Sequence, residues 1–389
     1  MIRVLIADDS AFMRKVLSDL FNGQSDFQVV GTAVNGKDTI DKVKKLKPDV
    51  LTLDVNMPVM DGLEALAVIM EDCPLPVIMV SSMTQRGTDA TIRALALGAV
   101  DFVSKAGGPI SKIDTIEQEI LEKCREAALA HVESDRHNAA DSKPLIYKPK
   151  PNEPDSPFVK RTEIKPRTGF IFGQKPTTSK IPTFTPTTTS IKPTAPLAPT
   201  GKKLVVIGTS TGGPQALQTV ITRLPGNLPC GVVVVQHMPA GFTKSLADRL
   251  NSISEIAVKE AENDEIIKNG QVYIAPGNFH LRVAPTTGGR KILLSQEPPV
   301  GNHRPAVNVM YDSAAQFGKD LVAVIMTGMG SDGCEGMKKI KACGGYSIAQ
   351  DEPSCVVYGM PKSVVDAGLA DEIQPLTKIA EAIVEAVRR

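Results

Sequence analysis

The sequence lacks a long apolar segment, an excess of either charge and any closely spaced pair of cysteines. No apolar run reaches the length of a membrane span, and the first residues, MIRVLIADDS, lack the three zones of a secretion signal. The six cysteines lie far apart without a C-x-x-C pair, which is typical of reduced thiols rather than disulfides or zinc ligands. We therefore expect a cytoplasmic protein that does not insert into a membrane.

Charge and motif content also argue against binding to nucleic acid. The formal net charge is +1 at pH 7, so the chain as a whole has no attraction for a polyanion. The C-terminal half contains no helix-turn-helix pattern and no basic recognition helix. At 389 residues, 42% of them apolar, the chain is long enough for two ordinary domains, each with its own core.

A change in composition divides the chain into two parts. Between Ser134 and Thr200 the sequence holds 12 of the 29 prolines, and 11 lysines and arginines against 5 acidic residues. Frequent proline removes backbone donors from helices and sheets, and the apolar clusters here are too sparse to form a core. We expect residues 132–200 to be a flexible linker between an N-terminal domain, residues 1–131, and a C-terminal domain, residues 201–389.

The N-terminal domain alternates apolar runs with amphipathic segments, which predicts a flavodoxin-like parallel α/β sheet. The expected strands RVLIAD, FQVVGTA, VLTLD, PVIMVS and VDFVSK end near Asp8 and Asp9, Asp54, Ser81 and Lys105. Functional residues of such sheets gather at this edge. Any one of these acids could simply cap a helix, but three together favour a hard divalent cation, Mg²⁺ above all. A cation beside a lysine suits phosphoryl transfer.

Over its whole length this domain resembles the receiver domain of two-component response regulators. The matching segments are ADDS, LTLDVNMPVMDG, PVIMVSS and DFVSK. The resemblance implies that Asp54 accepts a phosphoryl group from a histidine kinase. It also implies that Asp9, Asp54 and the main-chain carbonyl of Asn56 hold Mg²⁺, with Asp8 supporting the ion through water.

The same resemblance assigns the residues that respond to the phosphoryl group. Ser81 and Lys105 are expected to contact it, and Phe102 is expected to be the aromatic residue that changes its packing. The sequence departs from the family pattern after the lysine, where Ala106 replaces the usual proline.

The C-terminal domain again alternates strand and helix patterns. The expected strands are KLVVIG, CGVVVVQ, QVYIAPG, KILLSQ, DLVAVIMTG and YSIAQ, and the expected helices are PQALQTVITRL, GFTKSLADRLN, AVNVMYDSAAQFG and EGMKKIKACG. Consecutive Val and Ile residues predict strands that are buried on both faces. The expected fold is a doubly wound, mostly parallel α/β sheet.

Two glycine-rich motifs in this domain suggest different functions. GTSTG, at 208–212, matches G-x-S-x-G, a strand-to-helix turn that presents the hydroxyl of Ser210 to a substrate. GMGSDG, at 328–333, matches the G-x-G-x-x-G of nucleotide-binding proteins, and Asp351 follows at the distance of a ribose-binding acid. Both patterns also occur in ordinary turns between a strand and a helix.

A serine nucleophile needs a histidine base and an acid that orients it. The histidines of this domain are His237, His280 and His303. His237 ends the strand VVVVQH on the edge that carries Ser210, and Asp332 lies in the second glycine-rich loop on the same edge. Spacing alone leaves a Ser–His–Asp triad and a set of capped turns equally open.

The C-terminal domain resembles the catalytic domain of the chemotaxis protein-glutamate methylesterases, the CheB family. The matching segments are IGTSTGGPQAL, VVVVQHMPAGFTKSLADRLN, YIAPGNFHL, HRPAVNVMYDSAA and VIMTGMGSDGCEGM. The resemblance implies that Ser210 is the nucleophile, His237 the general base and Asp332 its orienting acid. It gives His280 and His303 no place in the triad, and it leaves open the role of Asn308, where we expect an acid.

These expectations combine into one function. The resemblance implies hydrolysis of glutamate γ-methyl esters on methylated chemoreceptors, and deamidation of particular receptor glutamines, under control of the receiver domain. The amide of Thr211 and an amide near Met329 are the expected donors to the oxyanion. No cofactor is expected in the catalytic domain, and the alternative is a receiver joined to a nucleotide-sensing module that performs no chemistry.

Overall fold

The computed structural model describes residues 1–82, 84–105, 113–129 and 203–389. The expected linker at 132–200 and the substitution at Ala106 both lie outside these ranges. The N-terminal and C-terminal regions each contain a sheet of parallel strands with helices on both faces. This confirms the α/β class that the alternating pattern predicted for both domains.

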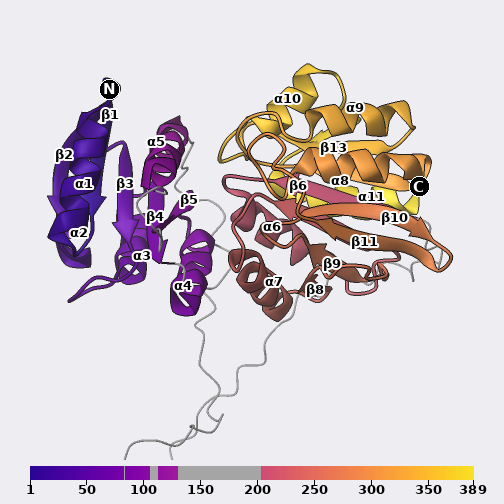
Figure 1. The fold of residues 1–389 in the computed structure, drawn as a ribbon, viewed down its shortest axis with the longest axis horizontal. Helices are drawn as coiled ribbons and strands as arrows, with labels where there is room; N and C mark the ends of the chain where they lie inside the picture. Colours follow the sequence, from indigo (N-terminus) through magenta and orange to yellow (C-terminus); the bar gives the residue numbers. More distant parts are fainter. Residues whose placement is uncertain (83, 106–112, 130–202) are drawn as a thin grey trace, which may run out of the picture. The chain divides into compact units, whose positions relative to one another are not determined.

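The N-terminal sheet has the strand order β2-β1-β3-β4-β5, and all its pairs are parallel (Figure 1). Its strands are β1 (Ile2–Ala7), β2 (Phe27–Ala33), β3 (Val50–Asp54), β4 (Val77–Ser82) and β5 (Asp101–Lys105). Its helices are α1 (Ala11–Asn22), α2 (Gly36–Leu46), α3 (Gly62–Asp72), α4 (Gln85–Ala96) and α5 (Ile113–Leu129).

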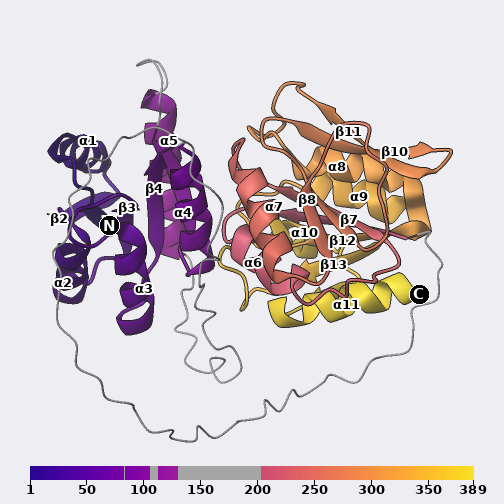
Figure 2. The same cartoon turned by 90° about the horizontal axis from the view of Figure 1, so that it is seen from below.

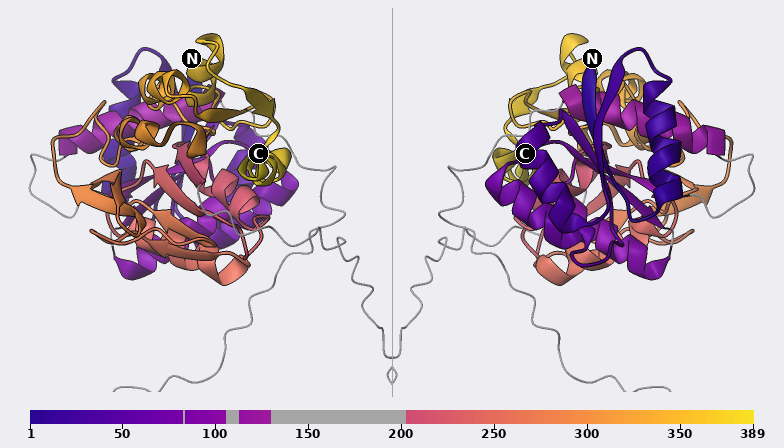
Figure 3. Two further views of the ribbon diagram at one scale, coloured as in Figure 1. Left: turned by 90° about the vertical axis from the view of Figure 1, so that its right-hand side faces the viewer. Right: turned by 90° about the vertical axis from the view of Figure 1, so that its left-hand side faces the viewer.

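Successive residues of the central strands are buried on opposite faces of this sheet. Val4 and Ile6 pack with α1 and α5, whereas Leu5 packs with α2 and α3, so the helices cover both faces (Figure 3). Burial on both faces is why β1 and β3 are almost continuously apolar. The strand ends leave the core together, and their polar residues therefore share one edge.

The C-terminal sheet has the order β14-β13-β12-β6-β7-β9-β8, with every pair parallel. Its strands are β6 (Leu204–Thr209), β7 (Gly231–Gln236), β8 (Ala257–Glu260), β9 (Gln271–Ile274), β12 (Leu321–Ile325), β13 (Tyr346–Gln350) and β14 (Glu372–Gln374). An antiparallel hairpin stands apart from it, formed by β10 (His280–Thr286) and β11 (Gly289–Ser295).

Helices and the hairpin cover the two faces of this sheet. One face packs against α6 (Gly213–Ile221), α7 (Phe242–Ile253) and α11 (Leu376–Arg388). The other packs against α8 (Val307–Ala314), α9 (Cys334–Ala342), α10 (Met360–Asp366) and the hairpin (Figure 2). A 3₁₀ helix at Ala315–Asp320 links α8 to β12. In the described ranges no helix combines the length and the apolar character needed to cross a lipid bilayer.

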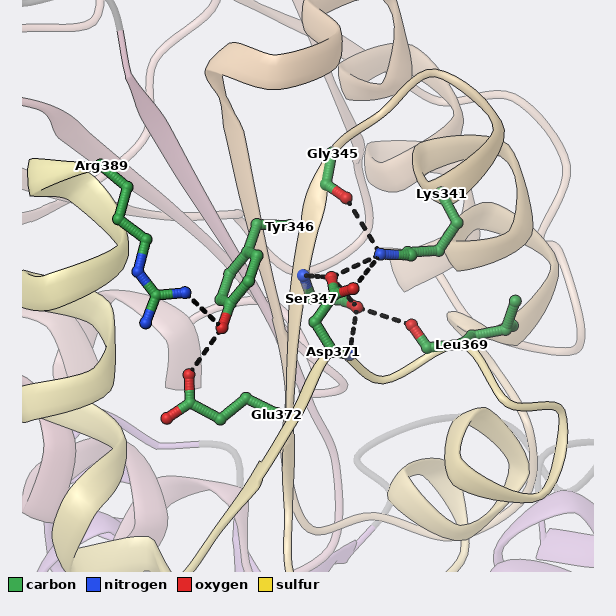
Figure 4. A network of polar contacts seen from close by, with 8 residues as sticks. All are labelled: Lys341, Gly345, Tyr346, Ser347, Leu369, Asp371, Glu372 and Arg389. Carbon is green, nitrogen blue, oxygen red and sulfur yellow. Dashed lines mark hydrogen bonds and ion pairs between the residues drawn. The ribbon is translucent and has the colours of Figure 1, made fainter.

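Polar contacts fasten the short edge strand β14 to its neighbours (Figure 4). The Asp371 carboxylate accepts hydrogen bonds from the backbone N–H of Ser347 at 2.8 Å and from the Ser347 hydroxyl at 2.9 Å. Lys341, on α9, forms an ion pair with the same carboxylate. These contacts, made by the residue just before β14, add to the parallel backbone pairing of β14 with β13 and tie the segment to α9.

Candidate active site and phosphoryl-acceptor site

Three carboxylates meet at the carboxyl end of the N-terminal sheet. Asp8 and Asp9 follow β1, and Asp54 ends the neighbouring strand β3. One carboxylate oxygen from each of the three lies within 4.8 Å of the others. The Lys105 ammonium, at the end of β5, is 2.9 Å from Asp8 Oδ2 and 2.8 Å from Asp54 Oδ2. The fold thus brings together the acids and the lysine that were expected at these strand ends.

Burial and charge act in opposite directions on these groups. Burial raises the pKa of Asp54, and the nearby Lys105 opposes the rise only in part. Burial lowers the pKa of Lys105, but its contacts with Asp54 and Asp8 outweigh burial and raise that pKa overall. One ammonium cannot neutralise three acids, so the cluster keeps an excess of negative charge on oxygen donors. This donor set fits a hard cation such as Mg²⁺.

Three residues near Asp54 are relevant to its expected role. Asn56 is exposed two residues after it, where its carbonyl was expected to bind the cation. Gly62 begins α3 so close to the strand that a Cβ there would lie 2.0 Å from the Asp54 carbonyl oxygen, which explains why a glycine is needed. The hydroxyl of Ser81 donates to the carbonyl of Gly87 at 3.1 Å, toward the first turn of α4.

Phe102, the expected switch residue, lies in β5 and faces a lysine of the same domain. The Lys123 ammonium is 5.1 Å from the centroid of its ring and donates to the Phe102 carbonyl at 2.6 Å. Burial lowers the pKa of Lys123, but Asp101 and Glu119 outweigh burial and raise it, so the group over the ring is a cation.

Ser210 occupies the turn between β6 and α6. Its backbone N–H donates to the carbonyl of Thr327 at 3.0 Å, and its own carbonyl accepts from Gly213 at 2.7 Å. Gly212 has φ +76°, a left-handed conformation that L side chains rarely adopt, and Pro214 stands in the first helical turn as expected. The turn therefore holds the serine at the carboxyl edge of the sheet.

His237 lies between Ser210 and Asp332. Its Nδ1 is 3.1 Å from Ser210 Oγ, and its Nε2 is 2.8 Å from Asp332 Oδ2. A carboxylate only accepts, so Nε2 carries the hydrogen, and the lone pair of Nδ1 is left to accept the serine proton. The three residues come from the ends of β6 and β7 and from the loop after β12, where the sequence pattern predicts them.

Backbone amides at the start of α8 hold the Asp332 carboxylate. Val307 N donates to Oδ2 at 2.7 Å and Asn308 N donates to Oδ1 at 2.9 Å. Burial alone would raise the pKa of Asp332, but His237 and these two amides lower it below its ordinary value. The side-chain oxygen of Asn308 accepts from Gly336 N at 2.8 Å, so this residue ties α8 to α9.

Gln236 is a residue of this site that the sequence did not reveal. It ends β7 and is 2% exposed. Its Nε2 donates to the carbonyls of Ser210 at 2.9 Å and His237 at 3.1 Å, and its Oε1 accepts from the Thr209 hydroxyl at 2.6 Å. One amide thereby fixes the backbones of the serine and the histidine relative to each other. The only signal in the sequence is a polar residue at the end of a wholly apolar strand.

The two expected oxyanion donors lie on loops beside the serine. Thr211 follows Ser210 directly, and Met329 follows Gly328, where an added Cβ would lie 2.7 Å from Ser210 Cβ. In the part of the chain that the structure describes, neither the Thr211 N–H nor the Met329 N–H donates to a backbone carbonyl. Neither amide is therefore committed to a backbone acceptor there, although Thr211 as a whole is only 5% exposed.

Two other residues that the sequence singled out have local structural partners. The Asp351 carboxylate accepts from the backbone N–H of Ser354 at 3.2 Å and caps the turn after β13. His280 is fully buried, and its Nε2 lies 3.1 Å from the carbonyl of Pro298. The second glycine-rich loop directs Asp332 toward His237, which is the contact a triad requires.

Comparison with known protein families matches both halves of the chain. Residues 205–383 match the family model of the CheB methylesterase, and residues 4–117 match that of the response regulator receiver domain. These matches confirm both of the resemblances that the sequence motifs suggested.

Curated relatives match this chain along nearly their whole length. A protein-glutamate methylesterase/protein-glutamine glutaminase of Halalkalibacterium halodurans is 45% identical over 389 residues, covering 100% of this chain and 99% of the relative. One of Thermotoga maritima is 45% identical over 388 residues, covering 99% and 98%. The solved catalytic domain of Thermotoga maritima CheB methylesterase is 52% identical, covers 47% of this chain and 97% of that one, and superimposes with a TM-score of 0.46.

Proposed function

Because this chain belongs to the CheB family of protein-glutamate methylesterases, we propose that it hydrolyses glutamate γ-methyl esters on chemoreceptors and deamidates particular receptor glutamines. The observation that carries the proposal is the continuous line from the Ser210 hydroxyl through His237 to Asp332. A receiver domain in the same chain supplies control by phosphorylation. The proposed substrate segments are cytoplasmic, and so is the proposed site of action.

The proposed reaction passes through an acyl-enzyme. His237 Nδ1 accepts the proton of Ser210 as the hydroxyl oxygen bonds to the ester carbonyl carbon. The imidazolium then gives this proton to the methoxy oxygen, methanol leaves, and a γ-glutamyl ester of Ser210 remains. Water attacks that ester with His237 again as the base, which releases glutamate and restores the serine. With glutamine as substrate the first leaving group is ammonia.

The amides beside the serine complete this proposed mechanism. The carbonyl oxygen becomes negative in each tetrahedral intermediate, and the N–H groups of Thr211 and Met329 are placed to stabilise that charge. Loss of a single donor of this kind slows hydrolysis on the order of 100-fold to 1,000-fold in other serine hydrolases. Asp332 remains a carboxylate throughout and stabilises the imidazolium.

In the N-terminal domain we propose that Asp54 receives a phosphoryl group from a histidine kinase. Asp8, Asp9, Asp54 and the carbonyl of Asn56 would hold a Mg²⁺ ion, which when bound neutralises charge on the phosphoryl oxygens. The Lys105 ammonium already lies against Asp54 and would move its contact to the new phosphoryl oxygens. We propose that Ser81 and Phe102 report this change to the catalytic domain.

Methanol release from methylated chemoreceptor membranes tests the proposed function. The full-length protein, treated with Mg²⁺ and a small phosphodonor, should release methanol, and a fluorophosphonate should phosphonylate it at Ser210 with release of fluoride. Ser210→Ala should abolish both, whereas Ser252→Ala, a change at an exposed serine on α7, should alter neither. Retention of more than a tenth of the activity by Ser210→Ala would refute the mechanism.

A further inference from the structure

We propose that His303 is a positioning residue that holds the ring of the catalytic base, His237, in its working plane. The two imidazoles are stacked face to face, with ring centroids 3.8 Å apart and an interplanar angle of 11°. The family resemblance gave His303 no role in the triad. This inference rests on the proposed function, because it assumes that His237 is the base.

The need for such a support follows from the hydrogen bonds of the base. The contacts of His237 Nδ1 with Ser210 and of Nε2 with Asp332 fix two points of the ring. The remaining freedom of the side chain is rotation about its Cβ–Cγ bond, which only these two contacts oppose. That rotation swings the lone pair of Nδ1 out of the plane it shares with Ser210 and weakens a bond that depends steeply on its angle. A parallel ring at van der Waals distance hinders that rotation.

The segment that carries His303 is fastened at several points. The Arg304 guanidinium donates to the carbonyls of Gln296 at 3.1 Å and Glu297 at 2.9 Å, and to Asn278 Oδ1 at 2.6 Å. Asn278 N in turn donates to the Arg304 carbonyl at 3.0 Å. These bonds cross-link residues 296–304 to the turn before β10. The His303 ring is therefore presented by a braced segment.

Two further contacts brace the same segment from inside and along its length. Nε2 of the fully buried His280 lies 3.1 Å from the carbonyl of Pro298, and since a carbonyl only accepts, Nε2 is the donor. Val300 and His303 exchange a pair of backbone hydrogen bonds, both 3.1 Å long. The contact with Pro298 gives a structural purpose to His280, to which the family resemblance gave no place in the triad.

The protonation state of His303 is consistent with a positioning residue and not with a second general base. Burial, reinforced by the neighbouring His237, lowers the pKa of His303 to about 4. The ring is therefore neutral near pH 7 and adds no charge beside the base. When His237 becomes an imidazolium during the reaction, it meets the π face of a neutral ring, which is a favourable partner for a cation. In the described ranges the ring nitrogens of His303 form no hydrogen bond.

Paired substitutions separate the stacking role from a chemical one. In the full-length phosphorylated protein, His303→Ala removes the stacked ring and His303→Phe replaces it with a ring that has no nitrogen. We expect His303→Ala to lower kcat for methanol release roughly 10-fold to 100-fold, the scale of a misplaced catalytic group, with KM changed less than twofold. His303→Phe should keep kcat within about threefold of the wild type. Gln296→Ala, which changes an exposed side chain of the same segment and keeps its carbonyl, is the matched control.

The outcomes of this experiment are distinct. A kcat above half the wild-type value in His303→Ala would overturn the proposal. Equal loss in His303→Phe and His303→Ala, at wild-type thermal midpoints, would also overturn it, because the nitrogens would then be required. Fluorophosphonate titration counts the folded sites, so that a partly unfolded variant is still scored on its active fraction. Failure of the wild type to react with the fluorophosphonate would instead refute the proposed function.

Discussion

Replacement of Asp332 by Asn is the sharpest perturbation of the proposed triad, because it changes charge and hydrogen bonding without changing shape. The carboxylate accepts from three N–H groups: His237 and Val307 at Oδ2, and Asn308 at Oδ1. An asparagine must point its NH₂ at one of these donors. If the NH₂ faces His237, Nε2 must become the acceptor and the hydrogen moves to Nδ1, which can then no longer take the proton of Ser210.

The expected loss follows from the geometry. With Nε2 and Oδ2 2.8 Å apart, the charge centres of the imidazolium and the carboxylate are separated by roughly 4 Å. At an effective dielectric constant of about 20 this attraction is about 4 kcal/mol, and it is present only when His237 is charged. Loss of about 4 kcal/mol of transition-state stabilisation slows a reaction about 1,000-fold. The wrong tautomer adds to this, so we expect kcat to fall about 10³-fold to 10⁴-fold.

Methanol release measures kcat and KM, and thermal unfolding supplies the control. Asp332→Asn should leave KM nearly unchanged and lower the thermal midpoint only slightly, since one hydrogen bond is lost. Asp332→Ala should lose similar activity and be clearly less stable, because the buried amides of Val307 and Asn308 lose their acceptor, at about 1–3 kcal/mol each. A folded Asp332→Asn protein with less than a tenfold loss in kcat would refute the role of Asp332.

Three further substitutions test other parts of the structure. Gln236→Glu places a carboxylate oxygen against the carbonyls of Ser210 and His237. We expect kcat to fall at least about tenfold and the thermal midpoint to decrease. An unchanged kcat would show that the backbone of this site does not need the Gln236 amide. Asp371→Asn should lower the free energy of unfolding at pH 7 by on the order of 1–2 kcal/mol. Burial raises the pKa of Asp371, but its hydrogen bonds outweigh burial and lower that pKa below the ordinary value. The stabilisation from this carboxylate is therefore present above about pH 4 and is lost on further acidification. Urea unfolding should show a smaller difference in unfolding free energy between wild type and Asp371→Asn at pH 3 than at pH 7. Asp54→Ala should abolish the activation of methanol release by Mg²⁺ and a small phosphodonor while leaving the basal rate, and activation that survives the change would place the phosphoryl group elsewhere.

The sequence predicted the parts of the fold that depend on local patterns. Continuous apolar runs identified the central strands, and the residues that follow them fell at one edge because parallel strands end together. For this reason the shared edge of Ser210, His237 and Asp332 follows from the strand pattern alone. The edge strands β8 and β14 were not expected, since four and three residues with few apolar side chains carry no clear period.

The missing parts of the site depend on contacts between distant segments. The amides that hold Asp332 belong to a helix that starts 25 residues earlier, and a backbone N–H has no signature in a sequence. The stacking of His303 on His237 joins residues 66 positions apart through a segment braced by Arg304. Gln236 stands next to the base in the chain, yet its function depends on the turn of another strand.

Two aspartates of this chain show how the fold assigns different chemistry to one residue type. In the proposed mechanism Asp54 forms a new bond to phosphorus, whereas Asp332 keeps its charge and its place through every step. Burial raises the pKa of Asp54, and its contact is the ammonium of a partly exposed lysine side chain, Lys105, 2.8 Å from Oδ2. At Asp332 two backbone amides and His237 overcome burial and lower the pKa, and the amides are fixed at the start of a helix. Environments that push the pKa values of like groups apart point to different roles. They fit our proposal, in which Asp54 reacts beside a side-chain cation and Asp332 orients His237 from a set of fixed backbone donors.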